Sequence, residues 1–247
     1  MLPDQSPEDD RKDTAKLKAV LVLCATIAFV VAPFFSGPFT GFNPDQLPNP
    51  ADRSPIQPAG YAFSIWGAIY LWLLASAGFG LVKRDTAEDW DKTRWPLFAS
   101  VGIGASWIAV ALTAPVIATV LIWVMLAGSL LALNAAPIRD KAWLKLPLGL
   151  YAGWLTAAAC VALGTIVMGY DILSPVNASW LCLAIALALA VPLSQRFRIA
   201  TYPFAVGWAL IGITLANAAE YPALAGVAAG GAAAMAWLAL KTLRPKV

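Results

Sequence analysis

Long apolar runs alternate with short polar breaks along most of the chain. Each run is close to the roughly 20 apolar residues that a helix needs to cross a bilayer. The breaks between them carry proline, glycine, asparagine or charged residues, which favour turns over continued helix. The pattern predicts eight membrane spans, at residues 17–36, 60–82, 97–113, 115–136, 146–169, 177–194, 200–217 and 222–241.

The third and fourth runs leave an alternative open, because the turn between them at residues 113–115 is tight. One long kinked helix would give seven spans and would put the basic segments 83–95 and 137–145 on opposite sides of the membrane. With eight spans, all of the 17 Lys and Arg residues except Arg53 fall on one side. Cytoplasmic loops are the ones enriched in Lys and Arg. We therefore expect eight spans with both termini in the cytoplasm.

The composition agrees with a polytopic membrane protein. Hydrophobic residues fill 60% of the 247 positions and charged residues 13%, whereas soluble domains hold roughly 25% charged residues. The N-terminal segment 1–16 is too acidic and mixed for a secretory signal, so 17–36 is expected to remain as the first span. We expect an all-α integral membrane protein, with a bacterial inner membrane as its simplest location.

The predicted spans carry no charge away from their ends, and this argues against several functions. A charge at the bilayer centre costs about 2.5–3.5 kcal/mol on insertion scales, so proteins keep one there only for function. An ion-coupled transporter, a pump or an acid–base enzyme is therefore disfavoured. The chain has no histidine, three scattered cysteines and a net charge of only +3. We expect no catalytic residue, metal site, required cofactor or nucleic-acid partner.

Segment 37–59 is the only long loop predicted on the extracytoplasmic side. Its six prolines disfavour helix and stiffen the chain. It is either a simple spacer or a lid over the mouth of a pocket, since long loops in compact proteins tend to be functional.

Aromatic side chains are grouped on helix faces. Phe63, Trp66 and Tyr70 are spaced i, i+3 and i+7, so they share one face of the second span. Tyr151 and Trp154 form an i, i+3 pair in the fifth span. Such groups are either ordinary helix-packing residues or the wall of a ligand pocket.

The stretch PAGYAFSIWGAIY, residues 58–70, resembles the second-span signature of the TspO/translocator-protein family, the tryptophan-rich sensory proteins. The signature's proline, phenylalanine, tryptophan and tyrosine correspond to Pro58, Phe63, Trp66 and Tyr70. Tyr61 stands where the family has another tryptophan.

Span five is similar to the family's fifth-span pattern at Tyr151, Trp154 and Ala158, and Trp107 resembles its third-span tryptophan. The family's asparagines near these tryptophans are absent, with Ser106 and Ala162 near their places. The resemblance covers residues 17–169 as a five-helix core. Residues 170–247 add three helices and a short basic tail, as in an extended, divergent branch.

The resemblance implies a five-helix bundle with a pocket beneath the first loop, for porphyrins and other tetrapyrroles or for sterol- or carotenoid-like molecules. Arg53 or Asn43 would meet ligand carboxylates, and tyrosine hydroxyls would donate hydrogen bonds. The implied ligand-binding residues are Pro58, Tyr61, Phe63, Trp66, Tyr70, Trp107, Tyr151 and Trp154.

Three functions follow from this resemblance and from the extra spans. The first is a membrane receptor or carrier that senses or transports the ligand. The second is a porphyrin-degrading photo-oxidative enzyme that uses a pocket tryptophan or tyrosine. The third is an assembly subunit whose last three spans dock onto a larger membrane complex. Small-residue faces at Gly149/Gly153 and Gly226/Gly230 permit close helix approach and are compatible with a homodimer.

Overall fold

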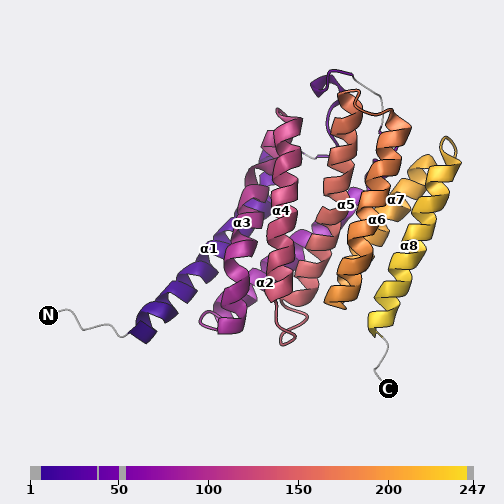
Figure 1. The fold of residues 1–247 in the computed structure, drawn as a ribbon. Helices are drawn as coiled ribbons and strands as arrows, with labels where there is room; N and C mark the ends of the chain where they lie inside the picture. The colour runs from indigo at the N-terminus through magenta and orange to yellow at the C-terminus, as the bar shows by residue number, and fades with distance from the viewer. Residues whose placement is uncertain (1–6, 38, 50–53, 244–247) are drawn as a thin grey trace.

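The structure, a computed structural model, describes residues 7–37, 39–49 and 54–243. Within these ranges it is all-helical and contains no strand (Figure 1). Two short 3-10 helices, η1 (Pro44–Gln46) and η2 (Gly60–Ser64), lie between the first two α-helices. The α-helices are α1 (Pro7–Ser36), α2 (Ile65–Lys83), α3 (Glu88–Ala111), α4 (Pro115–Ala135), α5 (Lys145–Gly169), α6 (Pro175–Phe197), α7 (Thr201–Asn217) and α8 (Pro222–Leu243).

The helices confirm the predicted polytopic α-helical membrane fold. Six of those in the described chain, α1, α2, α4, α5, α6 and α8, are long and apolar enough to cross a membrane. The other two helices, α3 and α7, are less apolar or shorter than a membrane span requires. Helix α3 begins with charged residues, and α7 has only 17 residues, which at 1.5 Å per residue span about 25 Å.

Helices α3 and α4 are separate, so the seven-span alternative is wrong. Helix α3 ends at Ala111, and α4 starts again at Pro115. Proline is favoured at the first position of a helix, where its missing N–H needs no partner. The backbone N–H groups of Thr113 and Ala114 donate to the carbonyl of Val110, which closes the turn.

Two helices begin earlier than the apolar pattern predicts. Helix α1 begins ten residues before position 17 and α3 nine residues before position 97. Both first turns hold acidic residues, which the positive end of the helix dipole stabilises. A search for apolar runs cannot detect such turns.

Three residues of the predicted loop 83–95 are buried in α3 as a result: Trp90, Thr93 and Arg94. Arg94 is 3% exposed and donates to the backbone carbonyls of Ala15, Arg84 and Asp85. Trp90 is also 3% exposed, because it packs against the end of α2 at Gly80.

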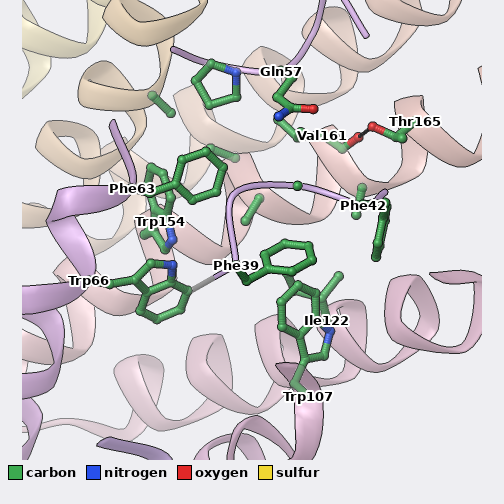
Figure 2. Close-up of a pocket in the computed structure, with 16 residues that line it drawn as sticks. Phe39, Phe42, Gln57, Phe63, Trp66, Trp107, Ile122, Trp154, Val161 and Thr165 are labelled. Atoms are coloured by element: carbon green, nitrogen blue, oxygen red, sulfur yellow. Dashed lines mark hydrogen bonds between the residues drawn. The ribbon is translucent and has the colours of Figure 1, made fainter. Parts of the chain in front are cut away.

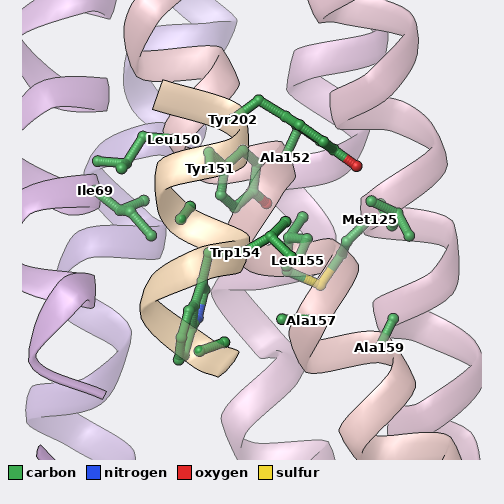
Figure 3. Close-up of a cluster of buried hydrophobic side chains, with 14 of the residues drawn as sticks. Ile69, Met125, Leu150, Tyr151, Ala152, Trp154, Leu155, Ala157, Ala159 and Tyr202 are labelled. Atoms are coloured by element: carbon green, nitrogen blue, oxygen red, sulfur yellow. The ribbon is translucent and has the colours of Figure 1, made fainter. Parts of the chain in front are cut away.

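Helix α5 is the centre of the bundle, with most of its side chains buried (Figure 3). It packs against α2, α4, α6 and α7. A side chain at Gly149 would overlap Ile199, and one at Gly153 would overlap the carbonyl oxygen of Tyr202. Gly149 and Gly153 form a GxxxG motif, and the close helix approach predicted there is therefore confirmed. The helix that approaches α5 is α7 of the same chain.

Hydrogen bonds within the apolar core join α5 to its neighbours. The hydroxyl groups of Tyr151 and Ser100 lie 2.9 Å apart and link α5 to α3. Those of Thr156 and Tyr202, also 2.9 Å apart, link α5 to α7. In the absence of water, such bonds satisfy polar groups that would otherwise be costly to bury.

The polar connections between α2 and α3 and between α4 and α5 meet at one end of the bundle. Asp140 accepts hydrogen bonds there from Arg84 at 2.6 Å and from Trp90 at 3.2 Å. Helix α1 begins and α8 ends at this same end (Figure 1). The basic loops therefore gather on one side, as the charge pattern requires. That this side faces the cytoplasm remains a prediction.

Candidate functional site

Two adjoining cavities lie beneath the segment that joins α1 to α2. They have about 600 and 740 Å³ of empty space, counting the part that opens outward. Only about 50 Å³ of the first cavity and 210 Å³ of the second can hold the centre of a water-sized sphere, which is less than the roughly 300–1,000 Å³ of typical ligand pockets. The cavities share five lining residues, Phe39, Phe63, Trp66, Trp107 and Ile122, so they form two parts of one aromatic site (Figure 2).

The segment between α1 and α2 covers this site. Phe39 and Phe42 project from it into the cavity, and Gln57 lines the cavity rim. Gln57 also bonds across the segment to the carbonyl of Thr40 at 2.8 Å. This arrangement favours the lid interpretation over the spacer interpretation.

Three hydrogen bonds fasten the cover to the ends of different helices. The Gln46 side chain donates to the carbonyl of Ala111 on α3 at 3.0 Å. The Asn49 N–H donates to the carbonyl of Gly169 on α5 at 3.0 Å. The Asn217 side chain on α7 donates to the carbonyl of Pro55 at 2.7 Å.

The aromatic stripe of the second span lines the site, as its spacing predicts. Phe63 lies in η2, while Trp66 and Tyr70 follow in α2. The rings of Trp66 and Tyr70 are stacked at 5.2 Å, with 20° between their planes. Phe29 of α1 meets both rings edge-on. The stripe thus packs against Phe29, a residue that the sequence pattern did not identify.

Trp107 lines both cavities from α3. Its indole N–H donates to the carbonyl of Ala118 on α4 at 2.7 Å, which fixes the ring. Phe39 of the covering segment meets it edge-on, with 4.9 Å between the ring centres. The cover and the cavity wall are therefore in direct aromatic contact.

Trp154 lines the site from α5, next to Phe63 and Trp66. It is 2% exposed, and among the described residues its indole nitrogen has no hydrogen-bond acceptor. Leaving a buried donor unpaired costs about 1–3 kcal/mol. Trp154 is therefore a buried donor that lacks an acceptor in the described wall of the cavity.

Tyr151 lies behind the wall and lines neither cavity. Its ring contacts Trp66 and Phe29, and its hydroxyl is paired with Ser100. The ring of Tyr151 thus packs against other aromatic residues, while its hydroxyl forms the link between α5 and α3.

The residues at the start of the signature separate in the structure. Pro58 is buried and lines the first cavity. Tyr61 lines neither cavity and is 41% exposed, because η2 turns its ring toward Trp208 of α7 at 5.4 Å. The indole N–H of Trp208 donates to the carbonyl of Ala62 and holds this turn in place.

Several lining residues were not predicted. Phe39 and Phe42 were detectable as two phenylalanines in an otherwise polar, proline-rich loop. Small side chains of α5 had no such signal, because alanines are common in any span. These small residues make the floor against which a ligand would lie: Ala157, Ala158, Val161 and Ala162.

The described lining is uncharged and almost wholly apolar. Its polar side chains are those of Thr40, Gln57, Tyr70 and Thr165, together with the tryptophan N–H groups. No group of three or more His, Cys, Asp or Glu suited to a metal occurs in the described part of the chain. Arg53 lies outside the described residues. Asn43 is exposed and lines neither cavity.

Comparison with known proteins relates this architecture to one family. The family model for TSPO-like proteins matches residues 17–241. The match extends over the three C-terminal helices as well as the predicted five-helix core. No curated protein and no solved structure matches this chain.

Proposed function

Because this chain belongs to the TSPO-like protein family, we propose that it binds a flat, hydrophobic ligand within the membrane and acts as its receptor or carrier. The observation that carries the proposal is the covered aromatic site with a buried, unpaired donor at Trp154. Binding sites for small molecules are typically apolar concavities with few, well-placed polar groups.

The lining supports a ligand with a broad aromatic or polyene surface. Phe63 and Trp66 meet Trp154 edge-on, with planes at 81° and 83°. Each aromatic pair of favourable geometry contributes about 0.5–1.5 kcal/mol beyond buried area. Tetrapyrroles and sterol- or carotenoid-like molecules have surfaces of this kind.

The absence of charge in the described lining restricts where an acidic group of the ligand can lie. Burying a carboxylate without a partner is far more costly than burying a neutral group. A porphyrin would therefore place its ring among the aromatic residues and its carboxylates at the covering segment, whose sequence includes Arg53. A neutral oxygen or nitrogen of the ligand would accept the bond from Trp154.

Titration of the purified protein in neutral detergent with protoporphyrin IX and with its dimethyl ester tests this proposal. We expect both to quench tryptophan fluorescence saturably, because the ring supplies most of the contact. Dissociation constants are expected in the micromolar range, equivalent to about −8 kcal/mol. If neither compound nor a sterol or carotenoid binds saturably, the receptor proposal is overturned.

Illumination of the porphyrin complex separates a receptor from a photo-oxidative enzyme. We expect the porphyrin absorption spectrum to stay unchanged apart from the bleaching seen without protein. Protein-dependent loss of the porphyrin bands, abolished by Trp66→Phe, would instead support degradation.

A further inference from the structure

A second concavity lies at the opposite end of the bundle from the aromatic site. It is bounded by the α4–α5 and α6–α7 connections and by the last turns of α6 and α8. It has about 2080 Å³ of empty space, including its mouth. Five basic residues line it, and we call them the basic basin: Lys141, Lys145, Arg196, Arg198 and Lys241.

The positive charge of the basin has no acidic counterpart. None of its described lining residues is Asp or Glu. The six ion pairs found among the described residues all involve residues of the α1–α3 region or Asp140, and none includes a basin residue. Like charges gathered in a concavity repel one another and attract an anion.

The hydrogen bonds of the basin residues hold side chains without neutralising them. Lys145 donates to the backbone carbonyl of Ala136 at 3.2 Å. Arg196 donates from two nitrogens to the side-chain oxygen of Asn134, at 2.8 and 3.2 Å. Both acceptors are neutral. Lys145 and Arg196 are therefore held in place by neutral partners.

Arg198 adopts a backbone conformation that favours glycine. It lies in the left-handed region, with φ 50° and ψ 47°, at the C-terminal cap of α6. Helices often end with a residue in this conformation, and it is usually glycine because a Cβ is unfavourable there. Non-glycine residues in strained conformations cluster at functional sites.

The rest of the basin wall combines polar and hydrophobic side chains. Ser194, Gln195 and Thr242 are its polar members. Ile138, Phe197, Ile199 and Leu238 line it beside the basic groups. Ile138 is 81% exposed in the connection that leads to α5. A purely water-soluble anion gains nothing from the hydrophobic part of this wall, whereas an acyl chain attached to an anion does.

We propose that the basic basin binds the phosphate of an anionic phospholipid headgroup at the end of the bundle predicted to face the cytoplasm. Lysine and arginine form strong, charge-assisted hydrogen bonds with phosphate oxygens. Basic pockets between membrane helices on this side commonly take acidic lipid headgroups. The hydrophobic part of the wall and the position at the membrane boundary favour a lipid over a free phosphate compound.

Native mass spectrometry of the delipidated full-length protein in neutral detergent tests the proposal. Dioleoylphosphatidylglycerol is compared with dioleoylphosphatidylcholine, and glycerol 3-phosphate is added as a competitor. We expect the anionic lipid to bind at least tenfold more tightly than the zwitterionic one, and increasing salt to weaken this preference. Glycerol 3-phosphate at equal concentration is expected to displace none of it.

The variant Lys145→Gln/Arg198→Gly/Lys241→Gln removes three charges and gives position 198 the residue that its conformation favours. We expect the lipid preference to fall by about ten- to a hundredfold, since each cation near an anionic surface contributes several-fold. The matched control is Lys16→Gln/Lys83→Gln/Lys92→Gln, which removes three exposed lysines outside the basin. It is expected to keep the preference.

Arg198→Gly alone should retain the melting temperature of the native protein and lose about threefold in affinity, which keeps the test independent of folding. Equal binding of the two lipids, or the same loss in the control triple variant, overturns the proposal. Displacement by glycerol 3-phosphate at equal concentration overturns the lipid as occupant and assigns the basin to soluble phosphate compounds.

Discussion

Trp154 has two properties that are seldom combined in one side chain. It is almost fully buried in the central helix, and its indole N–H has no acceptor among the described residues. Buried polar groups are nearly always paired, so an unpaired donor calls for an explanation. We propose that a ligand acceptor in the adjoining cavity pairs with this donor.

The variant Trp154→Phe tests the proposed hydrogen bond from the indole N–H separately from the packing of the ring. Phenylalanine keeps an aromatic ring in the wall and removes the N–H. We expect affinity for a porphyrin to fall about three- to tenfold, because a hydrogen bond contributes roughly 0.5–1.5 kcal/mol. Fluorescence titration measures the loss. Trp237→Phe is the control, since Trp237 is 57% exposed on α8 and lines neither cavity; an equal loss there would contradict the assignment.

The ion pair between Asp140 and Arg84 should make the stability of the fold depend on pH. Hydrogen bonds from Arg84, with support from the Trp90 N–H, lower the pKa of Asp140 below its ordinary value of 3.8. A lowered pKa means that the pair stabilises the fold above pH 3.8 and that this stabilisation is lost as pH falls below it. Asp140→Asn should lower the melting temperature at pH 7.

Thermal melts between pH 7 and pH 3 check this prediction. Asparagine tolerates the left-handed backbone of position 140, where φ is 55°. The substitution therefore changes the charge more than the turn. The difference between the two proteins should shrink as pH falls below 3.8. A constant difference across the range would show that the ion pair is not its cause.

Close packing of α5 against α7 is the main contact between the predicted core and the C-terminal helices. It depends on Gly149 and Gly153, whose missing side chains admit Ile199, Thr201 and Tyr202. The GxxxG face is consequently occupied within the chain. Gly226 and Gly230, by contrast, face open space on α8, and a homodimer through that face remains a prediction.

Gly153→Ala should destabilise the protein, because the new methyl group would overlap the carbonyl oxygen of Tyr202, and a backbone atom cannot move aside cheaply. Overpacking of this kind costs about 1–3 kcal/mol. Gly226→Ala is the matched control on an open helix face, where alanine should be neutral or slightly favourable. Melting temperatures in detergent compare the two, and equal values would refute the packing argument.

The described helices form one packed bundle. Its central helix, α5, contacts both the predicted five-helix core and the C-terminal helices. Helix α5 lines the aromatic site on one face and contacts α6 and α7 on others. Asn217 of α7 also holds the covering segment at Pro55. Ala209 of α7 also lines the first cavity, so the site is formed by residues of the predicted core and of the C-terminal helices together.

Removal of residues 170–247 should disrupt the protein even though it retains the predicted five-helix core. The truncated chain would expose Gly149, Gly153 and the hydroxyl of Thr156 that pairs with Tyr202. We expect aggregation on size-exclusion chromatography in detergent and loss of porphyrin binding. A monodisperse fragment with native affinity would show instead that residues 17–169 form an independent unit.

The amino-acid sequence was sufficient to predict the fold class, the number of helices and the aromatic stripe of Phe63, Trp66 and Tyr70. These follow from short-range properties: the apolar length needed to cross a bilayer, the charge of the loops and the periodicity of a helix. The starts of α1 at Pro7 and of α3 at Glu88 were not predicted, because acidic residues stabilise a first helical turn without being apolar.

Which aromatic residues reach the cavity depends on how the helices pack in three dimensions. Tyr61 and Tyr151 belong to the same motifs as Trp66 and Trp154, yet Tyr61 turns to α7 and Tyr151 lies behind the wall. The basic basin likewise joins residues from segments about 100 positions apart. Such outcomes depend on how helices distant in sequence pack against one another, and no local pattern encodes that contact.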